Sequence, residues 1–267
     1  PEDHVIRIIT EVNEPLSRAG YDVTNLERFG LMIRNSENAA YNYHKQMVSS
    51  GNAWSTSDGQ QMLWDAERTP VTMIAYAPYM SEAAPDASLV VNALTNQTTE
   101  ENVKSSDFLL MKATVDPEQD LTADGKLKIS LSHAMSKLLI KITVNGTTDA
   151  AMNKLGDMSI NGAVVNGICD LSATVPIVVP APDAVVATVA PYKGTESCEC
   201  ILPPQKIAEG FSVNFSYDGK LYIWTAKEAI ELEKGVEHTL TLNVNTTVRL
   251  AAKMARNWAT GQLIDRN

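Results

Sequence analysis

Acidic side chains that stand close together in the sequence are the first candidates for chemistry. Glu100 is followed directly by Glu101, and Asp65 lies two residues before Glu67. Two carboxyl groups can cleave a glycosidic bond when one acts as the acid and the other as nucleophile or base. With 32 Asp and Glu residues against 22 Lys and Arg residues in this chain, such pairs are more typical of solvated surface. We therefore predict no catalytic role for them.

Other catalytic and metal-binding patterns are missing from the sequence. The chain contains no G-x-S-x-G, H-E-x-x-H, P-loop or G-x-G-x-x-G motif. Its four histidines are scattered one by one, which argues against a metal site. His133 lies in an apolar context between two expected strands and is predicted to be buried and hydrogen-bonded. We predict a protein that is not an enzyme and binds neither a metal nor a cofactor.

Three cysteines in 267 residues are too few for a disulfide scaffold, so the fold must be stabilised by buried apolar area. Cys198 and Cys200 are too close in an extended strand to bridge one another. Cys169 would be the only partner for either of them. Free or half-buried thiols are the favoured interpretation.

Charge and hydropathy exclude two further classes of protein. The formal net charge of −10 argues against a surface that binds nucleic acid. No stretch approaches the ~20 consecutive apolar residues that cross a bilayer. Charged residues follow Pro1 directly, so we expect this chain to begin after any targeting segment.

Alternating and two-sided apolar patterns predict a mainly β protein. Residues 70–78 carry apolar groups on both faces and are bracketed by prolines, as expected of a strand inside a sandwich. Strand patterns at 126–131 and 138–144 are out of phase, which indicates a bulge or short turn between them. The prolines within 175–189 favour edge strands or extended linkers there.

The clearest local prediction is a hairpin over residues 211–226. Asp218-Gly219 fits the two central positions of a type I′ turn, which pairs Tyr217 with Lys220. Phe215 then lies opposite Tyr222, on a face that we expect to be buried. Another strand is expected over 240–244. Helix evidence is limited to 102–111, 149–155 and 251–258, and the polar stretch 144–154 suggests two domains, 1–146 and 147–267.

Aromatic side chains in the polar stretch 35–59 are candidates for ligand contacts. Tyr41, Tyr43 and Trp54 could stack on sugar rings or anchor a partner if this stretch is a long exposed loop. The favoured alternative is an ordinary excursion whose tyrosines pack on the flank of the sandwich.

Several segments, in the same order along nearly the whole chain, resemble the fimbrillin family, the type V pilins of Gram-negative anaerobes. The segments are Trp64 with residues 70–78 (PVTMIAYAP), 107–113 (DFLLMKA), 131–138 (LSHAMSKL), 201–205 (ILPPQ), the strand after Lys234-Gly235, and Trp258. The resemblance implies two tandem β-sandwich domains of transthyretin-like topology. It also implies a lipoprotein precursor that reaches the outer membrane and then contributes to a fimbria at the cell surface.

The resemblance further implies assembly by strand exchange. An Arg-specific protease would cut between Arg18 and Ala19 and release a first strand formed by Val5, Ile6, Ile8 and Ile9. A strand of a neighbouring pilin subunit would then fill the groove, since exposed sheet edges accept extended segments. Candidate donors are 245–250 and the tail 251–267, with Val248 and Leu250 as pocket fillers.

Two functions besides the fimbrial subunit are retained as hypotheses. One is a module at a pilus tip or on a surface lipoprotein that binds a host glycan or protein through exposed aromatic residues. The other is a hydrolase, which would require two clustered, buried carboxyl groups in a cleft.

Overall fold

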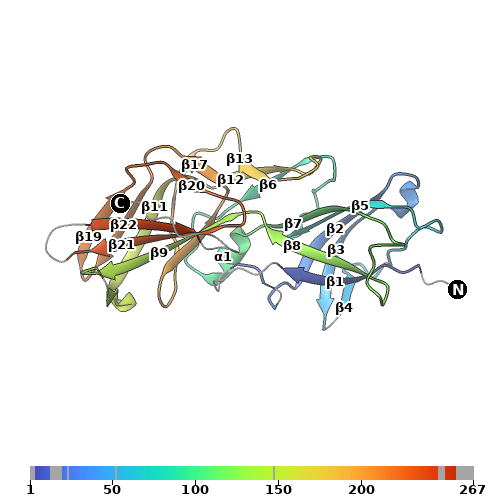
Figure 1. Cartoon of the computed structure of the whole chain (residues 1–267), viewed down its shortest axis with the longest axis horizontal. Coiled ribbons are helices and arrows are strands. Elements are labelled where there is room, and N and C mark those ends of the chain that lie inside the picture. Colours follow the sequence, from blue (N-terminus) through green and yellow to red (C-terminus); the bar gives the residue numbers. More distant parts are fainter. Residues whose placement is uncertain are drawn as a thin grey trace.

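The computed structural model of this chain describes residues 4–12, 20–22, 24–51, 53–146, 148–245 and 250–256. It is a mainly β, elongated molecule with several sheets and short helices (Figure 1). A seven-stranded sheet lies at the end that holds the first residues, and the other sheets lie towards the opposite end. The helical segments are α1 (Glu100–Ser106) and the 3-10 turns η1 (Ala39–Tyr41) and η2 (Met152–Lys154).

The seven-stranded sheet has the strand order β1-β8-β7-β5-β2-β3-β4. Its strands are β1 (Arg7–Val12), β2 (Arg28–Asn35), β3 (Tyr43–Ser50), β4 (Ala53–Thr56), β5 (Val71–Ala77), β7 (Leu109–Val115) and β8 (Lys126–His133). The sheet curls until β1 contacts β4, the strand at its other end. It is therefore a nearly closed, barrel-like sheet around its own apolar core.

The remaining strands form four smaller sheets. The second large sheet contains β9 (Ser136–Val144), β10 (Thr148–Asp149), β15 (Tyr192–Lys193), β16 (Cys198–Leu202), β21 (Glu237–Val244) and β22 (Leu250–Arg256). A four-stranded sheet contains β11 (Leu155–Val164), β14 (Val186–Val189), β18 (Ser212–Tyr217) and β19 (Lys220–Thr225). The last two sheets consist of β6 (Ser88–Asn92), β12 (Asn166–Asp170) and β13 (Val178–Pro180), and of β17 (Gln205–Ile207) with β20 (Ile230–Leu232).

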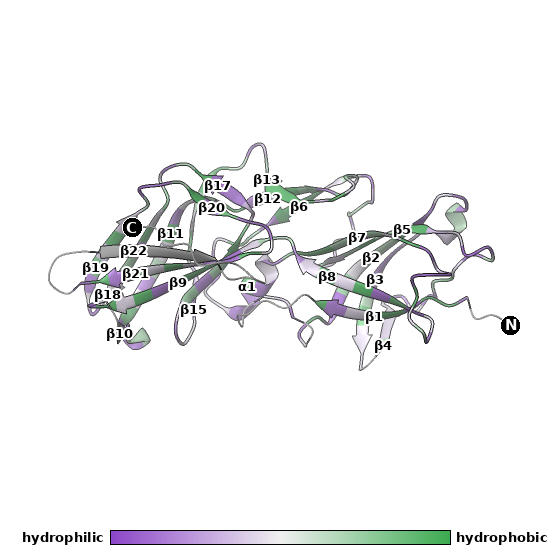
Figure 2. Ribbon diagram, in the orientation of Figure 1, coloured by the Kyte–Doolittle hydropathy of each residue, from purple (hydrophilic) through white to green (hydrophobic). Residues whose placement is uncertain are grey.

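Strand β5 explains why residues 70–78 are apolar on both faces. Met73 and Ala75 belong to the core inside the seven-stranded sheet. Ile74 and Tyr76 belong to a second core, which continues between the sheets at the other end of the molecule. Figure 2 shows hydrophobic residues along the strands at both ends. The prediction of an interior strand is confirmed, because each face of β5 packs against a different core.

The hairpin β18–β19 has the predicted register. Tyr217 pairs with Lys220 and Phe215 with Tyr222, and Asp218 and Gly219 both have positive φ. The burial of its aromatic face is partial, because Phe215 is fully buried whereas Tyr222 is only half-buried. The proline-rich stretch also behaves as predicted, since β13 and β14 are edge strands of their sheets.

Two local predictions differ from the structure. Within the stretch 35–59, Tyr43–Ser50 and Ala53–Thr56 form the strands β3 and β4, where the sequence allowed a long loop. Residues 250–256 are the strand β22, although their side-chain types favour a helix. The bulge or short turn predicted between 131 and 138 is present as the short connection 134–135, after which the chain passes from the seven-stranded sheet into the second large sheet. Pairing of β3 with β2 and of β22 with β21 outweighs the local propensity of these two segments.

The three cysteines are free and buried, which agrees with the favoured interpretation. Burial raises the pKa of the Cys169 thiol to about 11 and that of Cys198 to about 12. Burial also raises the pKa of Cys200. All three thiols are therefore protonated, apolar contributors to the core.

Candidate functional site

The first strand is the element on which the sequence analysis concentrates, and it lies at the edge of the seven-stranded sheet. β1 pairs in parallel with β8 from Arg7 opposite Lys126 to Val12 opposite Leu131. Just before β1, Ile6 N–H donates to the Met62 carbonyl over 3.0 Å, and Trp64 N–H donates to the His4 carbonyl over 2.8 Å. The strand is thus held by backbone hydrogen bonds along one side and at its beginning.

Alternate side chains of this segment enter the core. Ile6, Ile8 and Val12 are 7%, 5% and 6% exposed, respectively. Val5 and Ile9 are only half-buried, and Val5 instead forms an isolated bridge with Leu63. Among the four apolar residues that the resemblance assigns to the removable strand, Ile6 and Ile8 therefore fill the pockets of the core.

Strand β8 depends on β1 for most of its pairing. β8 meets β7 only where Leu109 lies opposite His133 and Leu110 opposite Ser132. Within the part of the chain that the structure describes, residues 126–131 have no strand partner other than β1. Loss of β1 would expose both edges of this stretch, together with the pockets of its inward-facing residues.

The other side of β1 faces a groove instead of a paired strand. Trp54 of β4 donates its indole N–H to the Thr10 hydroxyl over 3.1 Å and packs edge-on against Phe29. The groove has a volume of about 670 Å³, and its lining includes Ile9, Thr10, Leu26, Val48, Ser49 and Trp54. The seam between β1 and β4 is therefore closed by the hydrogen bond from Trp54 to Thr10 and by packing.

The predicted aromatic ligand contacts do not form one cluster. Trp54 lies opposite Ser49, whereas Tyr43 lies opposite Ile33 at the other end of β3. Six residues of strand separate these positions, which corresponds to roughly 20 Å. The Tyr43 hydroxyl is bound to the backbone of Leu63, and Tyr41 lies in η1. Only Trp54 lines the groove.

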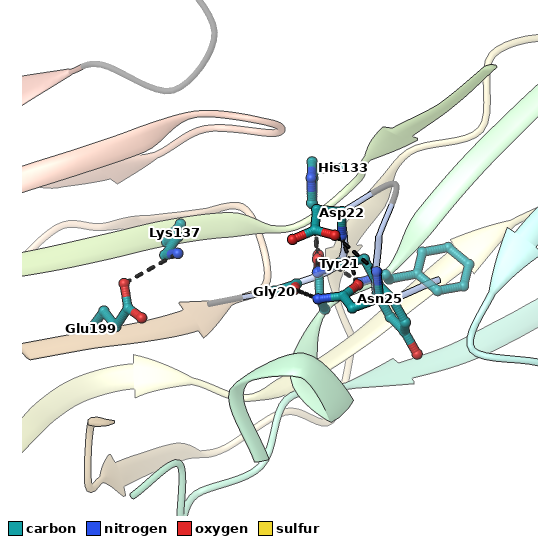
Figure 3. Close-up of polar contacts among 9 residues, drawn as sticks. Gly20, Tyr21, Asp22, Asn25, His133, Lys137 and Glu199 are labelled. Atoms are coloured by element: carbon teal, nitrogen blue, oxygen red, sulfur yellow. Dashed lines mark hydrogen bonds and ion pairs between the residues drawn. The ribbon is translucent and has the colours of Figure 1, made fainter. Parts of the chain in front are cut away.

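The chain that follows the predicted cleavage site is anchored where the two large sheets meet. Tyr21 N–H donates to Asp107 Oδ2 over 3.0 Å. Asn25 closes this segment on itself, because its side-chain amide donates to the Gly20 carbonyl and its Oδ1 accepts from Asp22 N–H, both over 2.8 Å (Figure 3). The described residues 20–22, 24 and 25 are therefore held together by hydrogen bonds and bound to a buried carboxylate.

Asp107 is 2% exposed and has several partners. His133 Nδ1 lies 2.9 Å from its Oδ2, and Phe108 N–H donates to its Oδ1 over 2.9 Å. Burial by itself raises the pKa of Asp107, but His133, Tyr21 N–H and Lys137 outweigh burial, so its pKa lies below the usual value. Close by in Figure 3, the ammonium group of the buried Lys137 lies 3.2 Å from the carboxylate of Glu199.

The sequence analysis found only part of this arrangement. His133 is buried and bound to Asp107, as predicted, whereas Asp107 and Tyr21 were not singled out. The clue in the sequence is an acidic residue directly before the apolar run 108–111, where a strand entering a core ordinarily has no charge. The carboxyl groups considered for a hydrolase do not form a buried pair. Asp65 is buried and bound to Asn35 and Thr69, whereas Glu67, Glu100 and Glu101 are exposed.

Several predicted positions lie at or beyond the limits of the description. Arg18, Ala19 and Val248 are outside the described residues. Leu250 begins β22 and pairs with Val244 of β21. Among the described residues, no group of three His, Cys, Asp or Glu side chains could hold a metal ion. No helix in the same ranges has both the length and the apolar character to cross a membrane.

Comparisons with known proteins agree with this architecture. A provisionally named cell adhesion protein of Bacteroides ovatus superposes with a TM-score of 0.73 at 15% identity, over 100% of both chains. Another from Bacteroides uniformis gives 0.69 at 15% identity, over 97% of this chain and 100% of the other. A fimbrial protein of Bacteroides vulgatus gives 0.60 at 13% identity, with the same coverage. These likenesses show a shared fold.

Similarity at the level of sequence comes from a family model. No curated protein shows significant similarity to this chain. The model described as fimbrillin-like matches residues 17–257, which is most of the sequence. That family consists of non-enzymatic fimbrial and adhesion proteins. The chain therefore belongs to the fimbrillin-like family.

Proposed function

We propose that the chain is a structural subunit of a cell-surface fimbria that assembles by protease-triggered strand exchange and supports adhesion. Cleavage between Arg18 and Ala19 would leave β1 attached by non-covalent contacts alone. A strand from a neighbouring subunit would then replace it beside β8. Membership of the fimbrillin-like family supports the fimbrial role, and the pairing of β1 supports the exchange.

The observation that carries this proposal is the dependence of β8 on β1. Without β1, residues 126–131 would offer unpaired backbone groups beside the vacated pockets of Ile6, Ile8 and Val12. Unpaired groups next to exposed apolar surface are unfavourable in water, and an incoming strand can satisfy both at once. Removal of one edge strand thus creates a site for another.

The spacing of apolar residues near the C-terminus matches the pockets that β1 fills. Every second side chain of the first segment is, in order, large, large, small and large; these are Ile6, Ile8, Thr10 and Val12. Val248, Leu250, Ala252 and Met254 repeat this order at the same spacing. Among the described residues, β22 is an edge strand that pairs with β21 alone, so it can leave its sheet at the cost of one partner. We propose it as the donor, running parallel to β8.

The proposal includes the location and architecture that the family resemblance implies. The precursor would reach the outer membrane as a lipoprotein, with other pilin subunits as partners. The two halves, 1–146 and 147–267, would be tandem β-sandwich domains of transthyretin-like topology. The crossing from β8 into β9 supports a two-part architecture, since these strands belong to different sheets, although it lies at residues 134–135 and places β9 with the second part.

Digestion of the full chain with an Arg-specific protease tests the proposal. We expect an early cut after Arg18, identified by intact mass, and larger species in native size analysis. In the sequence, Pro15 and Gly20 flank Arg18, and such residues favour a loop that a protease can reach.

The matched control is Arg18→Lys, which keeps the charge but removes the site for this protease. It should resist the early cut and stay at the size of the uncut chain. Cleavage of the unaltered chain after Arg18 without any change in size, even at high concentration, would contradict the proposal.

The groove beside Trp54 favours a second candidate function, a module at a pilus tip or on a surface lipoprotein that binds a glycan or host protein. An indole ring at the edge of a groove lined by Thr10 and Ser49 can stack on a sugar and exchange hydrogen bonds. Trp54→Ala should abolish binding to a glycan array, whereas Tyr41→Ala should leave it unchanged. No binding of the unaltered chain to any glycan would argue against this candidate.

A further inference from the structure

Strand β19 has an open backbone edge, and it lies towards the end of the molecule opposite the seven-stranded sheet (Figure 1). Within the described part of the chain, β19 pairs with β18 alone. Ala226 N–H donates to the Phe211 carbonyl over 2.9 Å, which marks these two residues as a hydrogen-bonded pair. Such pairs alternate along an antiparallel ladder, so the backbones of Tyr222 and Trp224 also bind β18. The residues between them therefore turn their N–H and C=O groups towards the open edge.

The residues whose backbone faces this edge are Leu221, Ile223 and Thr225. Their side chains are exposed as well, and Leu221 and Ile223 are 71% and 61% exposed, respectively. An edge that combines open backbone groups with exposed aliphatic side chains is a template for pairing with another strand. A strand added at this edge would satisfy the backbone groups and cover part of both aliphatic side chains.

β19 lacks the features that ordinarily protect an edge strand, which are short length, proline and several charged side chains. The edge strand β13 has three residues and includes Pro180, and the edge strand β14 has four residues. β19 has six residues (KLYIWT), no proline, and Lys220 as its single charge. Because β19 contains no acidic residue, two copies of this edge can meet although each chain carries a net charge of −10.

We infer that the β19 edges of two copies of this chain pair with each other antiparallel, with Ile223 of one copy opposite Ile223 of the other. The strand is complementary to itself in this register. On the outer face, Leu221 of each copy would lie opposite Thr225 of the other. On the inner face, Tyr222 of each copy would lie opposite Trp224 of the other, and cross-strand aromatic pairs stabilise sheets. The two strands would share about six backbone hydrogen bonds, two for each hydrogen-bonded residue pair.

The pair is expected to be weak between free subunits. One strand of six residues on each side is much smaller than the about 20–30 residues per partner of a standard stable interface. In a fimbria, many copies of this edge would lie along each fibre, and the contacts between two fibres would add up. β19 would then join adjacent fimbriae. This role rests on the proposed function, whereas the pairing itself does not.

Cross-linking of the full, uncut chain through one added cysteine tests the pairing at high protein concentration. Ile223→Cys would place the two new thiols on directly opposed residues, whose Cα atoms lie about 5.5 Å apart. The matched control is Leu221→Cys, because this position is even more exposed. In the proposed register, the two copies of residue 221 would lie four residues of strand apart, roughly 14 Å. The unaltered chain gives the background of the three buried native thiols.

With a short bifunctional thiol reagent, Ile223→Cys should form cross-linked dimers at least ~10-fold faster than Leu221→Cys, because only its thiols are held close together. A mixture of Leu221→Cys and Thr225→Cys should react nearly as fast as Ile223→Cys, since these two residues would lie opposite each other. Adding Ile223→Pro to both proteins of the mixture should return it to the rate of Leu221→Cys. Proline removes an N–H that points away from β18, so the hairpin itself keeps its pairing.

Equal rates for Ile223→Cys and Leu221→Cys would overturn the inference, and so would a mixture that Ile223→Pro does not slow. Neither result depends on cleavage, because every protein in the test is uncut. Failure of the chain cut after Arg18 to form larger species would instead overturn only the proposed function.

Discussion

Replacing Asp107 with alanine is expected to lower the free energy of unfolding by about 3–5 kcal/mol. The substitution would leave His133 Nδ1 without its acceptor at a 6% exposed site. It would also leave the Tyr21 and Phe108 N–H groups without the oxygens that accept their hydrogen bonds. Buried donors that lose their acceptor incur their full desolvation cost. Denaturant unfolding of the full chain measures the effect.

The matched control is Asp183→Ala, which removes an exposed carboxylate from the same chain. Its effect should stay within about 0.5 kcal/mol. Asp107→Asn should lie between the two, because an amide keeps one acceptor oxygen but loses the negative charge. Equal stabilities of the Asp107→Ala and Asp183→Ala variants would show that Asp107 does not hold the backbone at Tyr21.

Replacing Ile8 with aspartate is expected to lower the free energy of unfolding by about 4 kcal/mol or more. Ile8 is 5% exposed and packs with Phe29, Ile129 and the rest of the core inside the seven-stranded sheet. The change removes apolar burial and places a carboxylate in an apolar pocket. After cleavage, the variant strand should dissociate faster than the natural one, which native mass spectrometry can follow.

Ile9→Asp provides the matched control, because it introduces the same charge one residue later, on the half-buried face of β1. Its destabilisation should be clearly smaller, since water reaches that side chain beside the groove. If the two variants were equally stable, Ile8 would not fill a pocket of the core, and exchange of β1 for another strand would lose its apolar driving force.

Local sequence patterns were sufficient to predict the strands and turns whose conformation depends on residues close by in the sequence. The Asp218-Gly219 turn set the register of β18 and β19, because a type I′ hairpin requires positive φ at both central residues, and Asp-Gly is one of the pairs preferred there. The two apolar faces of residues 70–78 identified an interior strand for the same reason, since each face had to be covered. His133 could be predicted as buried, though its partner could not.

Long-range pairing was beyond the reach of these patterns. β1 and β8 are more than one hundred residues apart, and Ser130 is hydrogen-bonded to Glu11 across a sequence separation of 119. No turn links the two strands, so nothing local sets their parallel register. The contact of Asp107 with Tyr21 spans 86 residues and depends on the whole junction. Residues 250–256 became a strand through pairing with β21, against their helix propensity.

Hydrogen exchange of residues 126–131 tests the central claim, the replacement of β1 by a strand from another subunit. Amides paired in a sheet exchange slowly, and unpaired amides at an open edge exchange quickly. The uncut chain, the cut chain freed of residues 1–18 and the assembled product should be compared under the same conditions. We predict slow exchange in the uncut chain, fast exchange after release of β1, and slow exchange again in the assembled product. Fast exchange in assembled material, or retention of residues 1–18 within it, would contradict strand exchange.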